Sequence, residues 1–475
     1  MSGAGNVDEE QEQEQEQEQE QEQEKEQERH RKEEEKHWRD VARTFLWYRE
    51  FVVDDLKQRQ QHLNHLSDRH ASLLPSSTFE KIEAVAHAAL GNQDMLTDLV
   101  MHYSQEYGVP MPEKRVGDPI SPERQHRNEA VLHSLYREWT LEGKEERDAT
   151  FAPLLAALQR HLPVSSPELA YRQRVLVPGC GAGRLPAEVA VLGYAAEGNE
   201  FSAYMLMASN FILNGVDKPN VYTFYPFLER VSNVVGVSDP MQGLSLPDSV
   251  AVEMMENSPY YHLYVNGDQD SDEDPGDADA MSVAGEGEGA QEQDEDGEKF
   301  ELCCVCRDPE STAKRWKNMP MRPPLGMSSG DFVAIYGEKD LSNPAGSYDC
   351  IMTCFFIDTA PNVIEYIETI FYALRPGGVW INLGPLLYHW SKDQDYNGDE
   401  RYNKSIELSY EEVRHVVKKV GFVFLEEDRV KCTYTRHRRS IMHTEFNALF
   451  FVAKKNSDQG KKSNKSKKDK KDNDK

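Results

Sequence analysis

Glycines at positions 179, 181 and 183 form a turn between an apolar run at 175–177 and a helix-compatible run at 185–192. A buried strand that leads into a glycine turn and a helix N-terminus brings backbone N–H groups close to a nucleotide-like ligand. Such a turn also occurs without any ligand, so the glycines alone are a weak indication of a nucleotide site.

Two residues near the turn narrow the class of ligand. Glu200 follows about twenty residues later, where the next parallel strand would end and a carboxylate can accept both ribose hydroxyls. Arg184 stands where a dinucleotide site prefers another glycine, and we expect Arg184 itself to contact the ligand. This departure disfavours NAD and favours a smaller adenosyl ligand.

Asp358 ends a near-continuous apolar run at 348–358, which is typical of a central parallel strand. A carboxylate at the carboxyl end of such a strand faces the ligand-binding edge of a sheet. A structural alternative is that Asp358 caps a helix that begins near Asn362.

The rest of the C-terminal two thirds alternates between strand and helix patterns. This alternation predicts right-handed crossovers and a doubly wound α/β sheet, closed by an antiparallel pair at 422–425 and 446–452. The other expected strands lie at 175–177, near 194–197, at 221–226 and at 379–383, and the expected helices at 202–214, 362–374 and 409–420.

The region before the glycine turn reads as helical. Apolar residues recur at helical spacing from Trp38 to about Leu74, and three further helices are expected up to Leu90, over 93–107 and over 122–142. In the last of these, Val131, Leu135 and Trp139 should point inward. The sequence therefore predicts an N-terminal helical lid domain at 37–165 ahead of an α/β domain at 166–454.

Three low-complexity segments have too few apolar residues to form a core. We expect disorder in the Glu/Gln-rich arm at 1–36, in an acidic insertion at 266–298 and in a Lys-rich tail at 455–475. The arm has a solvated helix as its alternative, and the insertion could bind a basic partner. The tail lysines are consistent with nuclear import or with a solubilising role.

Composition limits the class of protein. The net charge of −29 over 475 residues argues against general nucleic-acid affinity. No apolar leader and no run of about 20 apolar residues is evident, so we expect a cytoplasmic protein, without a membrane segment, that could also be nuclear. The cysteines at 303, 304 and 306 lack a second pair or a nearby histidine, so no metal site is predicted.

The glycine turn, Glu200, the pair Asp331-Phe332 and the run at 374–378, Leu-Arg-Pro-Gly-Gly, together resemble the class I S-adenosylmethionine-dependent methyltransferases. The resemblance implies a Rossmann-like seven-stranded sheet and S-adenosylmethionine as cofactor. It places the methionine part near Gly179 and Gly181 and the ribose on Glu200. It also places Asp331 and Phe332 beside the adenine and Cys354 in the pocket wall.

Three longer stretches, at 176–194 with 198–202, at 354–360 and at 380–389, resemble the carnosine N-methyltransferase family. The likeness extends from about Trp38 to Val452 and leaves out the three low-complexity segments. It implies methyl transfer to an imidazole nitrogen of the dipeptide β-alanyl-histidine, giving anserine.

The family resemblance also suggests individual contacts. It implies that Asp358 and His389 touch the dipeptide, although a loop histidine without a ligand is the usual alternative for His389. Tyr388 either binds substrate or only packs. Phe446 stands where the family has a substrate-contacting tyrosine, so the exact substrate is left open.

Two positions in the helical domain match cofactor contacts of the family. Arg137 matches an arginine that reaches the cofactor, which would explain a lid that closes the pocket. Ser134 stands where the family commonly has glutamine.

A protein histidine methyltransferase and a non-catalytic scaffold on a methyltransferase core are the alternative functions, and a homodimer is left open.

Overall fold

The computed structural model describes residues 25–26, 28–29, 31–112, 122–164, 169–267, 324–338, 345–390 and 403–456. Most of the arm, of the acidic insertion and of the Lys-rich tail lies outside the described residues, as do the cysteines at 303–306. The chain forms two compact units, Met1–Asn128 and Glu129–Lys475. The second unit thus includes residues 129–165, which the sequence assigns to the helical domain.

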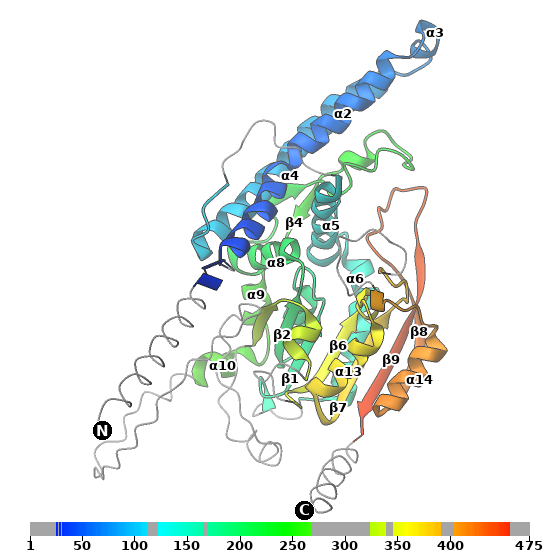
Figure 1. Ribbon diagram of the computed structural model, residues 1–475. Coiled ribbons are helices and arrows are strands. Elements are labelled where there is room, and N and C mark those ends of the chain that lie inside the picture. Colours follow the sequence, from blue (N-terminus) through cyan, green and yellow to red (C-terminus); the bar gives the residue numbers. More distant parts are fainter. Residues whose placement is uncertain are drawn as a thin grey trace, which may run out of the picture. The chain divides into compact units, whose positions relative to one another are not determined.

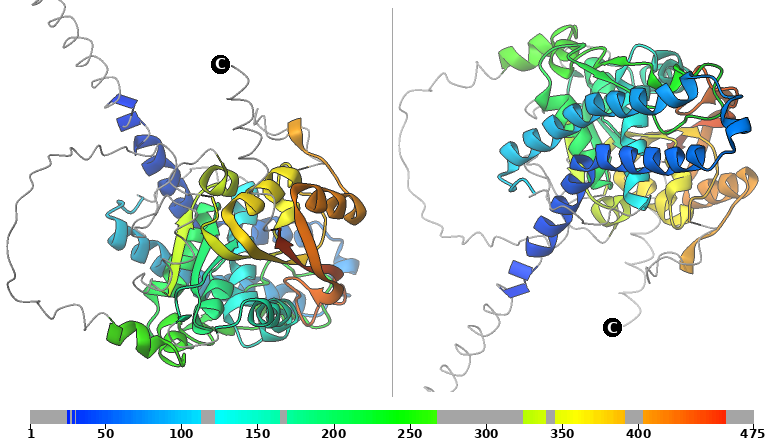
Figure 2. Two further views of the ribbon diagram at one scale, coloured as in Figure 1. Left: turned by 90° about the horizontal axis from the view of Figure 1, so that it is seen from below. Right: turned by 90° about the horizontal axis from the view of Figure 1, so that it is seen from above.

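The first unit is built from helices. Residues 31–46 are helical, including the end of the arm for which disorder is expected, and α2 (Tyr48–Asn64), α3 (Asp68–Ala71) and α4 (Ser77–Tyr107) follow. α2 and α4 lie side by side (Figure 2), and Asn92 donates a 2.8 Å hydrogen bond to the Tyr48 hydroxyl.

α4 is one helix where the sequence predicts two. Glycine at 91 costs a helix about 1 kcal/mol relative to alanine, which favours a break there. Buried residues on both sides of that glycine, Ala89 and Met95 among them, bury enough apolar surface to keep the helix continuous.

The second unit contains a seven-stranded sheet in the order β5-β2-β1-β6-β7-β9-β8. All neighbouring pairs are parallel except those that involve β9, which is antiparallel to both β7 and β8 (Figure 1). The doubly wound α/β fold and its antiparallel closing pair are therefore confirmed. The strands are β1 (Arg174–Pro178), β2 (Ala195–Glu200), β5 (Leu325–Ser329), β6 (Tyr348–Cys354), β7 (Leu374–Gly384), β8 (Phe422–Thr433) and β9 (Glu445–Lys455).

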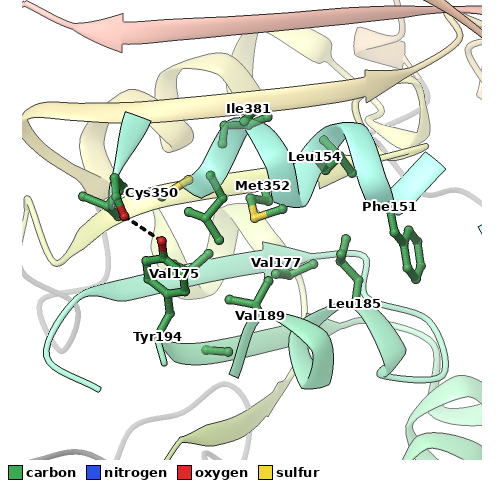
Figure 3. Packing of buried hydrophobic residues seen from close by; sticks show 14 of the residues in the cluster. Phe151, Leu154, Val175, Val177, Leu185, Val189, Tyr194, Cys350, Met352 and Ile381 are labelled. Atoms are coloured by element: carbon green, nitrogen blue, oxygen red, sulfur yellow. Dashed lines mark hydrogen bonds between the residues drawn. The ribbon is translucent and has the colours of Figure 1, made fainter. Parts of the chain in front are cut away.

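Helices cover both faces of this sheet. On one face, α6 (Lys144–His161) and α7 (Arg184–Val191) pack their apolar side chains against β1, β6 and β7, as Figure 3 shows for Leu154 and Val189. Tyr194 anchors this layer by donating a 2.6 Å hydrogen bond to the carbonyl of Leu162. The other face carries α12 (Phe332–Tyr336), α13 (Val363–Ala373) and α14 (Tyr410–Val420).

The segment between β2 and the insertion leaves the main sheet. α8 (Ala203–Asn210) continues into a π-helix, Phe211–Gly215. The strand expected at 221–226 is present as the short strand β3 (Tyr222–Phe224). It lies outside the main sheet and pairs with β4 (Leu244–Leu246) in a separate antiparallel sheet. α9 (Ala251–Glu256) and α10 (Tyr261–Gly267) follow, and none of the helices in the described ranges is long and apolar enough to cross a membrane.

The strand directions bring distant segments to one edge of the sheet. β1, β2, β5, β6, β7 and β8 run the same way, so their carboxyl ends meet there together with the start of β9. This is the edge at which open α/β sheets bind their ligands. The glycine turn, Glu200 and Asp358 all follow or end strands at this edge.

Candidate active site

The glycine turn lies between β1 and α7, and two of its glycines are required by conformation and by space. Gly179 and Gly181 have φ angles of 63° and 58°, which L side chains rarely adopt. A Cβ at Gly179 would run into the ring of Phe356, and one at Gly181 would lie 2.7 Å from Oε1 of Glu138. The turn is thus held close to side chains from two other segments.

Glu200, the last residue of β2, binds the turn directly. Its Oε2 accepts a 3.0 Å hydrogen bond from the N–H of Gly181, and its Oε1 accepts from the N–H groups of Phe201 and Ser202. Burial raises the pKa of this carboxyl, and the three N–H donors oppose that shift. A carboxylate accepts about four hydrogen bonds, so capacity remains for a hydroxyl donor.

Asp331 and Phe332 have structural partners. Asp331 caps α12, because its Oδ1 accepts hydrogen bonds from the backbone N–H groups of Val333 and Ala334. Phe332 is buried and meets Phe356 and Tyr366 edge-on, at centroid distances of 5.4 and 5.3 Å. The adenine contacts expected of both residues stay predictions.

The end of α5 (Pro122–Trp139) meets the glycine turn. Trp139 donates a 2.9 Å hydrogen bond to the carbonyl of Ala182. Ser134 and Arg137, both expected at the cofactor, bind Oε1 of Glu138, at 2.9 and 2.8 Å, and their cofactor contacts stay predictions. The three side chains form one buried cluster against Gly181.

Arg137 stays charged in this buried position. Burial acts to lower its pKa, but Tyr434 and Glu138 act in the opposite direction and the net shift is upward. The guanidinium lies over the Tyr434 ring, 4.4 Å from its centroid. Its Nε and Nη1 are buried without a hydrogen-bond partner in the described part of the chain.

Arg184 uses its side chain for structure. Its guanidinium stacks on Trp139 and binds Asp248 and Glu188, both at 2.8 Å. Only its backbone N–H reaches the site cluster, through a 3.3 Å hydrogen bond to Oε2 of Glu138. The side chain is thus committed to α7 and to the segment after β4, and its expected cofactor contact stays a prediction.

Asp358 and His389 lie on adjoining segments after β6 and β7. Asp358 is 2% exposed, and its Oδ2 accepts a 2.9 Å hydrogen bond from the N–H of Leu387. Asn362 caps α13 through the N–H of Ile364, so the alternative role of Asp358 as that cap is wrong. Burial raises the pKa of Asp358, while the Leu387 N–H and the nearby His389 act to lower it.

The neighbours of Asp358 differ in exposure. His389 is exposed, and its backbone N–H donates to the carbonyl of Asp358 at 3.1 Å. Tyr388 is buried, has a φ of 35° and donates a 2.7 Å hydrogen bond to the carbonyl of Leu408. Burial raises the pKa of Tyr388 to about 12, so its hydroxyl is neutral and serves to hold the loop.

Phe446 belongs to an aromatic group at the same edge. Phe355 stacks on Tyr434 with centroids 4.8 Å apart and meets Phe446 edge-on at 5.4 Å. Phe355 has a φ of 53°, a conformation that costs a bulky residue about 1–2 kcal/mol. Cys354, directly before it, is a neutral thiol, since burial raises its pKa to about 12.

Three residues of this edge were missed by sequence reasoning: Glu138, Phe355 and Tyr434. Glu138 had a signal, because it is a charge three residues after the buried Leu135 on the apolar side of its helix. Tyr434 had no such signal in the sequence, because its place beside Phe355 depends on how β8 and β9 end.

Among the described residues, no group of three His, Cys, Asp or Glu side chains could hold a metal ion.

Comparison with known proteins identifies the family. The model of the carnosine N-methyltransferase family matches residues 118–268 and 309–457. The chain belongs to the carnosine N-methyltransferase family. A mouse carnosine N-methyltransferase is 30% identical over 428 residues, which cover 89% of this chain and 86% of the mouse protein.

Distant organisms contain further relatives. A carnosine N-methyltransferase of Dictyostelium discoideum is 30% identical over 88% of this chain and 76% of its own length. The Drosophila melanogaster protein named carnosine N-methyltransferase unmet is 30% identical over 89% of this chain and 80% of its own length. The resemblance to the family and the methyltransferase class of enzyme are therefore confirmed.

Proposed function

We propose that the protein transfers the methyl group of S-adenosylmethionine to an imidazole nitrogen of carnosine, β-alanyl-histidine, giving anserine. The observation that carries this proposal is the buried carboxylate of Asp358, on a loop that is hydrogen-bonded to the segment of His389. The relatives named as carnosine N-methyltransferases support the choice of dipeptide.

The residues at the glycine turn fit such a cofactor. Nε and Nη1 of Arg137 are buried donors without a partner among the described residues, as a carboxylate ligand requires. Glu200 has acceptor capacity left for a ribose hydroxyl, and Gly179 and Gly181 allow close backbone approach. When bound, the cofactor supplies an electrophilic methyl group on a sulfonium.

Asp358 suits the reaction of an imidazole. The attacking nitrogen must have a lone pair, so the ring is neutral and the other nitrogen carries a proton. An ionised Asp358 accepts that proton in a hydrogen bond, which selects the tautomer and stabilises the positive charge that grows on the ring. The charge grows as the nitrogen–carbon bond forms and the carbon–sulfur bond breaks.

Alignment then supplies most of the remaining rate. Phe355, Tyr434 and Phe446 form an aromatic group at the same edge of the sheet as Asp358, and we infer that the imidazole packs against this group. A nitrogen held in line with the methyl group and the sulfur reacts far faster than one that is free to turn. No strong base is needed, because the methylated imidazolium loses its proton after transfer.

Product analysis tests this function. The full-length protein is incubated with methyl-labelled S-adenosylmethionine and either carnosine, other histidine dipeptides or a cell lysate, and products are identified by mass spectrometry. We expect methyl-carnosine as the main product. Label only in lysate proteins would favour a protein histidine methyltransferase, and no binding of the cofactor by calorimetry would favour a scaffold.

A further inference from the structure

Glu138 is a buried carboxylate to which no step above gives a role. It is 1% exposed and accepts hydrogen bonds from Ser134 Oγ at 2.9 Å, Arg137 Nη2 at 2.8 Å and the Arg184 N–H at 3.3 Å. Burying a carboxylate is costly unless it is paired and hydrogen-bonded. Ser134 lies against Gly181 and Arg184 is the first residue of the helix after the turn, so this charge lies next to the glycine turn.

The glycine turn passes directly beside this carboxylate. A Cβ at Gly181 would lie 2.7 Å from Oε1 of Glu138 and 3.3 Å from Oγ of Ser134. The N–H of the same glycine donates to Glu200. Gly181 therefore lies between two carboxylates, Glu200 on the ribose side and Glu138 on the α5 side.

Arg137 and Glu138 form an ion pair with no net charge, and each side chain can still form further hydrogen bonds. Nη2 of Arg137 binds Glu138, while Nε and Nη1 are buried and without a partner among the described residues. A carboxylate accepts about four hydrogen bonds, and three reach Glu138. The two side chains thus present unfilled donors next to an unfilled acceptor.

We propose that Arg137 and Glu138 form a clamp for the zwitterionic end of the cofactor, with Glu138 accepting its α-ammonium group. This proposal rests on S-adenosylmethionine being the cofactor. An α-amino acid carries its carboxylate and its ammonium on one carbon, so it matches adjacent arginine and glutamate side chains.

Calorimetry with cofactor analogues separates the two halves of the clamp. The wild-type protein is titrated with S-adenosylhomocysteine, with its deaminated analogue that keeps the carboxylate, and with its decarboxylated analogue that keeps the amine. A hydrogen bond between charged groups contributes about 1.5–3 kcal/mol, which corresponds to roughly 10- to 150-fold in affinity. We expect the wild type to bind each analogue weaker than S-adenosylhomocysteine by about that factor.

The variant Glu138→Gln assigns the ammonium half. It should lose affinity for S-adenosylhomocysteine by about tenfold or more, yet bind the deaminated analogue as the wild type does. The control Glu188→Gln, which alters a carboxylate bound to Arg184 on α7, should change neither affinity.

Three results have separate meanings. Equal losses for both ligands in Glu138→Gln would overturn the clamp and make Glu138 a structural residue. If that variant does not fold, equal affinity of the wild type for S-adenosylhomocysteine and its deaminated analogue would overturn it as well. Failure of the wild type to bind S-adenosylhomocysteine at all would instead overturn the proposed function.

Discussion

The backbone N–H of His389 donates a 3.1 Å hydrogen bond to the carbonyl oxygen of Asp358, which ties the segment after β7 to the segment after β6. The Asp358 side chain makes a second bond between these segments, with the N–H of Leu387. The carboxylate is thereby held at the ligand-binding edge by the loop that carries the exposed histidine.

Asp358→Asn should lower turnover of the dipeptide by about 100-fold or more, because a neutral amide cannot stabilise the growing imidazolium charge. The amide oxygen can still accept from Leu387, so the loop should stay in place. Cofactor affinity measured by calorimetry should change little. Comparable loss of turnover and of cofactor affinity would show that Asp358 is structural.

The rate should rise with pH as two protons are lost. Burial raises the pKa of Asp358, and the carboxyl must be ionised to accept the imidazole N–H. The imidazole, with an ordinary pKa of about 6.5, must be neutral to attack. Below both pKa values, log kcat/KM should rise with a slope of about 2 per pH unit in the wild type.

The same profile in Asp358→Asn should keep only the imidazole ionisation. Its slope should therefore fall to about 1 over the acidic range, since one of two titrating groups is gone. Residual activity in the variant is measured at enzyme concentrations high enough to follow a slow reaction. Identical slopes in the two proteins would exclude Asp358 as one of the titrating groups.

Glu200→Gln should weaken binding of S-adenosylhomocysteine by about tenfold or more, because ribose hydroxyls would lose a charged acceptor. The glutamine oxygen can still accept from the N–H of Gly181, but its NH2 group cannot accept from Phe201 and Ser202, so urea denaturation checks that the variant is folded. Calorimetry measures the affinity, and turnover at saturating cofactor should fall much less. An unchanged dissociation constant would refute the ribose contact.

Gly181→Ala and Gly108→Ala form a matched pair. Both glycines have left-handed φ angles, 58° and 66°, but a Cβ meets Glu138 and Ser134 at Gly181 and nothing within 4 Å at Gly108. Gly108→Ala should cost only the backbone strain, about 1 kcal/mol. Gly181→Ala should destabilise the protein further and also weaken cofactor binding.

Urea denaturation and calorimetry on the two glycine variants test this difference. Retained cofactor affinity in Gly181→Ala would contradict a cofactor site at the turn. A loss of cofactor affinity in Gly108→Ala would mean that strain alone explains the effect.

Tyr434→Leu should raise KM for the dipeptide several-fold and lower the free energy of unfolding by about 0.5–1.5 kcal/mol. The substitution removes the ring that stacks on Phe355, and an aromatic pair contributes about 0.5–1.5 kcal/mol. It also removes the ring below the Arg137 guanidinium. Steady-state kinetics measure the change. The control is Tyr410→Phe, which removes only the hydroxyl of a half-buried tyrosine bound to Glu427. Equal KM values in both variants would contradict the stacking role.

Local patterns were enough to predict the frame of the fold. Apolar runs that are buried on both faces predict parallel strands, and β1, β2, β6 and β7 lie where those runs are. The glycine turn and Glu200 follow from the same patterns, because each is defined by its place directly after a strand. Asp358 was found for the same reason, although β6 ends four residues before it.

Only the tertiary structure decided what surrounds these residues. Arg184 looks like a ligand contact in the sequence, but its partner Asp248 comes from a segment after β4. Phe332 is buried by aromatic rings from the segment after β6 and from α13, and Tyr434 meets Phe355 because β8 ends at the same edge as β6. Strand and turn patterns depend on neighbours within a few residues, whereas ion pairs and ring contacts depend on which distant segments the fold packs together.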